Sequence, residues 1–248
     1  MRHFPAEFSD LLSRQGLRLL NGTHPLAGKL AEPRTRFLAL DDLLAPARIK
    51  GAAALLEHSI GPHLRLMEQP IPPESIWEMQ EDYAELLPKT MRQRTLYLDA
   101  GRSRGRQAAE EIGLLAMLRS ESYQAFAAAL AGRPLRRKYG LQAIAYGPGD
   151  YAGPHNDHHP EEPLARHGYL DMHIGFVTPN AQSQLLVYAK AGHFTEWVET
   201  ARNGLLTAYR LPFWHYTTPL IAKPKKPDGA RRWILLGTFL FKDQSTKA

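Results

Sequence analysis

From Leu141 to Phe241 the chain consists of short runs rich in β-branched and aromatic residues, separated by Gly, Pro, Asn and Asp. Runs of this length, bounded by turn residues, are typical of strands and not of helices. Eight such strands suit a jelly roll, in which a sheet folds over itself and encloses an interior. The expected strands are residues 141–146, 151–157, 169–177, 183–189, 193–198, 204–210, 213–220 and 231–241.

The residues before this region read mainly as helices, and the fold class expected for the whole chain is therefore α+β. We expect residues 1–92 to form a helical N-terminal extension packed on the core, and residues 93–248 to form the jelly-roll domain. The extension supports the barrel in this interpretation, because amphipathic helices need a surface to bury against. The first expected helix covers residues 9–20, is capped by Ser9 and ends at Asn21–Gly22. Further helices are expected over 72–87 and over 105–132, the latter with a break near Ser120. A short strand is expected over 95–100.

Composition limits the chemistry that the chain can perform. Its 248 residues include 44% hydrophobic residues, which is enough to build a sizeable core, and they include no cysteine. Disulfide frameworks, thiolate catalysis and cysteine-ligated zinc or iron–sulfur sites are therefore excluded. Any metal site must use His, Asp or Glu.

Charge and hydropathy give weaker indications of partner and location. The net charge is +6, but the basic residues are scattered, and the run KPKKPDGARR (223–232) is most simply a solvated turn. Binding to nucleic acid is thus possible but not favoured. The sequence shows no secretion signal and no apolar run approaching the roughly 20 residues of a membrane span, so we expect a cytoplasmic protein with no membrane partner.

The stretch GPHNDHH (153–159) contains the strongest candidate for metal binding. His155 and Asp157 are two residues apart, and on a strand both would point to the same face. His215, in the later run FWHYTTPL, could supply a third ligand from another strand. Two imidazoles and one carboxylate form a facial triad that leaves positions on the metal open for substrates.

The last predicted strand begins with two arginines. Arg231 and Arg232 would point to opposite faces, so only one can enter the barrel, and we favour Arg232 because it directly precedes the apolar run. A guanidinium there suits a dicarboxylate. His173 and His193 are more simply core or surface residues. The adjacent His158 and His159 are not expected to be ligands.

Taken in order, YGPGDYAGPHND, GLLTAYRLPFWHYTTP and GARRWILLGTFLF resemble the core of the Fe(II)/2-oxoglutarate-dependent dioxygenases, particularly the prolyl-hydroxylase-like branch. The resemblance covers about residues 94–241 and implies a double-stranded β-helix with N-terminal and flanking helices. It also implies that His155, Asp157 and His215 bind iron and that Arg232 or Arg231 binds the C5 carboxylate of 2-oxoglutarate. Tyr146 would line the cosubstrate pocket.

The activity implied by this resemblance is oxygenation with Fe(II), 2-oxoglutarate and O2, releasing succinate and CO2, with ascorbate as a possible reductant. The preferred reaction is hydroxylation of an amino-acid side chain that is protein-bound, free or carrier-bound. The alternatives are oxidative demethylation of nucleic acid, a non-enzymatic cupin-like metal-binding protein and a zinc hydrolase. One sequence identifies neither the substrate nor the oligomeric state.

Overall fold

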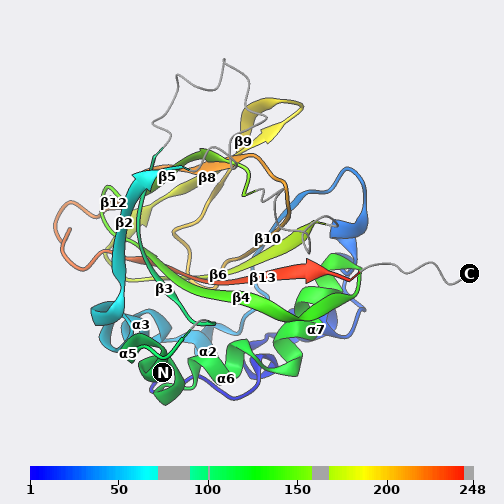
Figure 1. The fold of residues 1–248 in the computed structure, drawn as a ribbon, viewed down its shortest axis with the longest axis horizontal. Helices are drawn as coiled ribbons and strands as arrows, with labels where there is room; N and C mark the ends of the chain where they lie inside the picture. The colour runs from blue at the N-terminus through cyan, green and yellow to red at the C-terminus, as the bar shows by residue number, and fades with distance from the viewer. Residues whose placement is uncertain (72–89, 100, 158–167, 243–248) are drawn as a thin grey trace, which may run out of the picture.

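A single antiparallel β-sheet dominates the computed structural model, which describes residues 1–71, 90–99, 101–157 and 168–242. Eleven strands curl into a nearly closed barrel (Figure 1), and a two-stranded ribbon of β7 and β12 lies beside it. The strands are β1 (Phe37–Leu40), β2 (Arg65–Pro70), β3 (Thr90–Tyr97), β4 (Leu135–Tyr146), β5 (Tyr151–His155), β6 (Tyr169–Val177), β7 (Ala181–Ser183), β8 (Leu185–Lys190), β9 (His193–Glu199), β10 (Leu206–Arg210), β11 (His215–Thr217), β12 (Ile221–Ala222) and β13 (Arg232–Phe241).

Strand β3 joins the two walls of the barrel. The sheet order is β1-β10-β6-β13-β4-β3-β5-β11-β8-β9, with β2 added to β3. The second half of β3 pairs with β4, whereas Met91 and Arg92 in its first half pair with β5. One wall therefore holds β6, β13 and β4, and the facing wall holds β5, β11 and β8, as the predicted jelly-roll architecture requires.

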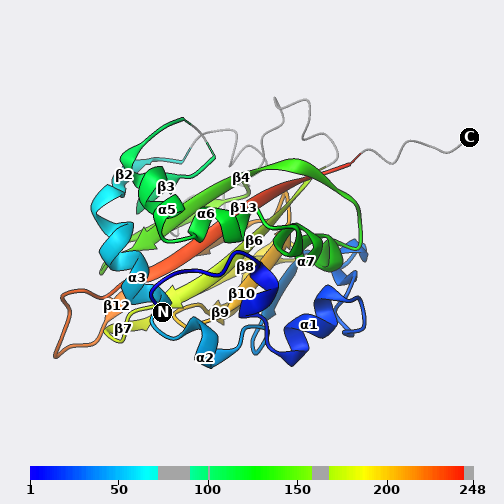
Figure 2. The same ribbon diagram turned by 90° about the horizontal axis from the view of Figure 1, so that it is seen from below.

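The helices of the described residues lie over one wall of the barrel. They are α1 (Arg14–Leu20), α2 (Pro46–Ile49), α3 (Ala52–Ser59), α5 (Arg104–Glu111), α6 (Leu114–Leu118) and α7 (Glu121–Ala131), with 3-10 turns η1 (Phe8–Leu11), η2 (Lys29–Ala31) and η3 (Gly61–His63). Figure 2 shows them over the outer face of β4, β13 and β6.

The largest apolar core lies between this wall and the helices. On the strand side it is built from every second residue of β6 and β13, including Met172, Ile174, Trp233 and Leu235, and it also contains Phe8 from the N-terminal segment. Because strand side chains alternate, the residues between these point into the barrel. The largest part of the apolar packing is thus outside the barrel, and its interior combines smaller apolar clusters with polar groups.

Helix boundaries follow local capping chemistry. Ser120 begins α7 by accepting the backbone N–H of Tyr123, and Gly132 ends it in the left-handed region at φ 61°. The break predicted near Ser120 is therefore confirmed. The predicted Ser9 cap is wrong, because residues 8–11 form the turn η1 and Ser13 caps α1, while the predicted end at Asn21 is correct.

Each of the eight predicted runs contains a strand, but some strands differ in length. The run 213–220 keeps only the three residues of β11, since Pro219 has no N–H to continue a ladder. The strand predicted over 95–100 is β3, which begins earlier, at Thr90.

The segment before residue 93 adds strands as well as helices. β1 pairs with β10 and β2 with β3. The division at residues 92 and 93 stays a prediction, and the helix expected over 72–87 lies outside the described residues. Among the described residues, no helix has the length and apolar character needed to cross a membrane.

Candidate metal and cosubstrate site

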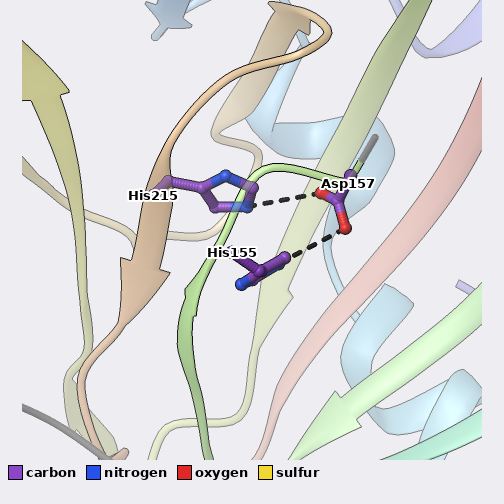
Figure 3. Close-up of side chains that lie close together, drawn as sticks. All are labelled: His155, Asp157 and His215. Carbon is purple, nitrogen blue, oxygen red and sulfur yellow. Dashed lines mark ion pairs between the residues drawn. The ribbon is translucent and has the colours of Figure 1, made fainter. Parts of the chain in front are cut away.

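The three predicted ligands come together on one wall of the barrel. His155 ends β5 and His215 begins β11, and the two residues are directly paired across these antiparallel strands. Asp157 follows two residues after β5. One ligand atom from each of the three side chains lies within 4.8 Å of the others (Figure 3).

Backbone carbonyls orient both imidazoles in the same way. Nδ1 of His155 lies 2.6 Å from the Gly153 carbonyl oxygen, and Nδ1 of His215 lies 2.8 Å from the Phe213 carbonyl oxygen. A carbonyl oxygen only accepts hydrogen bonds, so each Nδ1 must carry the proton. Each Nε2 then keeps its lone pair for a metal, which is how ligating histidines are commonly held.

The carboxylate of Asp157 lies between the two Nε2 atoms. Its Oδ1 is 3.4 Å from Nε2 of His155, and its Oδ2 is 3.6 Å from Nε2 of His215 (Figure 3). The predicted strand continued through Asp157, but β5 ends at His155 and Asp157 adopts a left-handed conformation at φ 53°. The direction of the Asp157 carboxylate therefore does not come from alternation along a strand. Non-glycine residues in the left-handed conformation are often found at functional sites.

This donor set fits a divalent transition metal such as Fe(II). Two neutral imidazoles and one carboxylate match its ligand preferences and leave coordination positions open. Burial, and next the proximity of His155, lower the pKa of His215 to about 4, which keeps this imidazole neutral in the form that binds a cation. Both histidines are buried and Asp157 is partly exposed.

A cavity of about 280 Å³ opens in front of the three ligands, and Arg232 and Tyr146 line it together with them. Arg232 is 2% exposed and its guanidinium lies 5.5 Å from the centre of the Tyr146 ring. Burial raises the pKa of Tyr146, so its hydroxyl stays protonated. Tyr146 and Arg232 are paired residues of β4 and β13, and both point inward.

Arg231 lies on the other side of the sheet. Its Nε is 3.7 Å from Glu57 of α3, and it does not line the cavity. Alternation along β13 thus separates the two arginines, as the sequence predicted, and Arg232 is the one that enters the barrel.

Arg232 forms no ion pair with a described carboxylate, although the more distant Glu199 favours its charged form. Its Nη1 donates to Oε1 of Gln184 at 3.1 Å, and its Nε has no hydrogen-bond partner among the described residues. Burial lowers its pKa. A buried guanidinium in this state is costly unless an anion binds to it.

Gln184 is a site residue that the sequence analysis missed. It is fully buried, and its amide nitrogen donates to the carbonyl oxygens of Asp150 and Thr218. These bonds fix the direction of the side-chain amide, so that its oxygen faces Arg232. A glutamine in an otherwise ordinary strand run carries no sequence signal for this task.

Strand β6 supplies two further cavity residues, Asp171 and His173. The sequence favoured a core or surface position for His173, and the structure places it on the cavity wall, where its Nε2 lies 3.0 Å from the Tyr209 hydroxyl. Burial lowers the pKa of His173 to about 3. Burial, and next the charge of Asp157, raise the pKa of Asp171 to about 8. His193 is exposed on β9, and His158 and His159 lie outside the described residues.

No family model and no curated protein matches the sequence. Solved structures do match its fold. A member of the 2OG-Fe(II) oxygenase family from Burkholderia pseudomallei has 12% identity and a TM-score of 0.52, with 87% of this chain and 89% of that chain covered. A prolyl hydroxylase from Trichoplax adhaerens, in complex with a hypoxia inducible factor peptide fragment, has 10% identity, a TM-score of 0.53 and coverages of 92% and 91%. A non-heme alpha ketoglutarate dependent carbocyclase from nogalamycin biosynthesis has 12% identity, a TM-score of 0.50 and coverages of 95% and 86%.

These similarities are too distant in sequence to carry more than the fold. The matched folds agree with the curled sheet of this chain. The group of His155, Asp157 and His215 lies on the inner side of that sheet. The chain therefore has the fold of the Fe(II)/2-oxoglutarate-dependent oxygenases, the prolyl-hydroxylase-like branch included, as the sequence resemblance predicted.

Proposed function

We propose that this chain is an Fe(II)- and 2-oxoglutarate-dependent oxygenase that hydroxylates an amino-acid side chain and releases succinate and CO2. One observation carries the proposal: a triad of two imidazoles and a carboxylate shares a single cavity with a buried arginine that forms no ion pair with a described carboxylate. A metal site alone does not need this arginine. A chelating dicarboxylate needs both features, one for each end.

Each residue has a distinct task in this proposal. His155, Asp157 and His215 would hold Fe(II), which with O2 and 2-oxoglutarate supplies the oxidising chemistry. Arg232, aimed by Gln184, would bind the C5 carboxylate, and the protonated Tyr146 beside it would offer a hydrogen-bond donor. The apolar residues Ile234 and Leu236 on the same wall would limit water in the cavity.

The amino-acid substrate is the finer part of the proposal. The Trichoplax prolyl hydroxylase holds a peptide on a similar fold, whereas the nogalamycin enzyme is a carbocyclase. The cavity of about 280 Å³ is near the lower end of the roughly 300–1,000 Å³ typical of small-molecule sites. A cavity of this size suits a small ligand or a single side chain, which agrees with an amino-acid substrate.

The test is succinate formation from 2-oxoglutarate by purified protein with Fe(II), ascorbate and O2. We expect turnover in the wild type, none in His155→Ala or Asp157→Ala, and a raised KM for 2-oxoglutarate in Arg232→Ala. Arg231→Ala is the matched control, because it removes the adjacent guanidinium from the outer face and should leave this KM unchanged.

A second measurement does not depend on turnover. Anaerobic protein with Fe(II) and 2-oxoglutarate should give a metal-to-ligand absorption band that requires His155 and Asp157. If both the band and succinate are missing, the oxygenase proposal is wrong, and a zinc hydrolase or a cupin-like binding protein becomes the better interpretation.

A further inference from the structure

The cavity has a second ionisable side chain at the end opposite Arg232. Along the pairing of β13 with β6, Arg232 lies opposite Val177 and Thr238 lies opposite Asp171. The two positions on β13 are six residues apart, which is about 20 Å of strand. Arg232, Thr238 and Asp171 all line the same cavity. A cosubstrate carboxylate held by Arg232 is therefore out of reach of Asp171.

The carboxyl group of Asp171 is buried and lacks a partner on one side. The residue is 5% exposed, and its Oδ1 has no hydrogen-bond partner in the described part of the chain. Thr238 provides one side-chain hydrogen bond, and no described lysine or arginine forms an ion pair with the carboxyl group. A buried carboxyl group with an unpaired oxygen destabilises the protein unless something binds to it.

The surroundings of Asp171 are polar and lie next to the metal ligands. Its cross-strand neighbour on β10 is Tyr209, whose ring centre is 5.0 Å from that of His215. Gln142 and the half-exposed Tyr97 also line the cavity, two residues along the strands from Asp171, at the level of His173. This end therefore offers hydrogen-bond acceptors, and Tyr209 connects it to the metal ligand His215.

These features match a cation better than a neutral or anionic group. An ammonium offers three hydrogen-bond donors and a guanidinium five, and neither has an acceptor. A bound cation would stabilise the ionised form of Asp171, whereas an anion would bind at Arg232, so the two ends of the cavity favour ligands of opposite charge.

Building on the proposed function, we propose that Asp171 recognises the substrate by binding a cationic nitrogen, so that the substrate is an amino acid with a basic side chain, free or within a peptide. The ammonium or guanidinium would contact Oδ1 of Asp171. The adjoining methylene groups would then lie beside His215, where oxidation takes place.

The experiment measures how basic and neutral probes stimulate succinate formation in the wild type. The basic probes are L-lysine and L-arginine, each free and within a capped Gly-X-Gly tripeptide, and the neutral isosteres are norleucine and citrulline in the same forms. We expect at least one basic probe to stimulate roughly tenfold more than its isostere, the preference typical of a charge-assisted hydrogen bond. In Asp171→Asn this ratio should fall to about one, and in Asp171→Glu part of it should return.

A binding readout complements turnover. Thermal unfolding of the metal-free wild type should shift upward with the stimulating basic probe and not with its isostere. Asp228→Asn, in the exposed loop before β13, is the matched control and should keep the full ratio.

Failure of this inference can be told apart from failure of the proposed function. If 2-oxoglutarate gives the absorption band and succinate, but no basic probe outperforms its isostere or Asp171→Asn keeps the ratio, the substrate assignment is wrong and the oxygenase stands. If the band and succinate are both missing, the function itself is wrong.

Discussion

The pH dependence of stability should change markedly when Asp171 is replaced by Asn. Burial and the charge of Asp157 raise the pKa of Asp171 to about 8 in the folded protein, from 3.8 in the unfolded chain. Between these values the folded state carries a proton that the unfolded state has lost. The stabilisation that Asp171 contributes is therefore at its full value below about pH 4. It declines as the pH rises and is lost once the pH passes 8.

The magnitude follows from this shift. A single proton bound only by the folded state gives a slope of about −1.4 kcal/mol per pH unit. Because the slope declines near the folded pKa, the loss between pH 6.5 and 8 should be about 1.6 kcal/mol. Asp171→Asn cannot ionise, so the difference in unfolding free energy between variant and wild type should change by this amount across the window, in favour of the variant at high pH.

Urea unfolding at pH 6.5, 7, 7.5 and 8, with a chelator to keep metal away from Asp157, measures this difference. The histidines contribute equally to both proteins and cancel. The exposed Asp10→Asn is the control, and its curve should run parallel to that of the wild type. A wild type and an Asp171→Asn variant with parallel curves would refute the assignment of Asp171 as a buried, protonated carboxyl.

Three further outcomes follow from the structure. Asp150→Asn should lower the unfolding free energy by about 2 kcal/mol in urea titrations. The Asp150 carboxylate is 1% exposed and accepts hydrogen bonds from Arg94 at 2.5 Å and from the Gly147 N–H at 2.7 Å. The loss is moderate because Arg94 is partly solvated. Trp233→Ala should cost about 3–5 kcal/mol in the same assay, since the indole is fully buried between β13 and the helices. Fe(II) under anaerobic conditions should raise the melting temperature of the wild type, and His155→Ala should abolish that rise.

The architecture could be predicted because strand runs and turn residues are local signals. β6 was predicted over its full span, 169–177, and the run 231–241 begins one residue before β13. The short strands β1, β2, β7 and β12 were missed, since the pairing of edge segments depends on the rest of the sheet more than on their own residues. The cap of α1 was misplaced by four residues, because Ser9 and Ser13 both look like caps and packing decides between them.

The predicted ligands were brought together for a reason different from the one expected. His155 and His215 are cross-strand partners, which no spacing in the sequence reveals. Asp157 points to them from a left-handed residue beyond the strand. Alternation required only one of Arg231 and Arg232 to face the barrel, and the structure places Arg232 there, while its role in binding stays a prediction.

The residues at the far end of the cavity were missed because alternation does not say what lies on each side of a strand. In YLDMHIGFV, Asp171 and His173 alternate with Leu170, Met172 and Ile174. This pattern is typical of a strand with one solvent-exposed polar face and one buried apolar face. In the structure nearly every residue of β6 is buried, and the polar face is turned inward. An outward-facing Asp171 would be solvated and of little consequence. Turned inward, with one oxygen unpaired, the same residue is expected to make stability depend on pH, and it would become the negative end of the cavity when a cation binds.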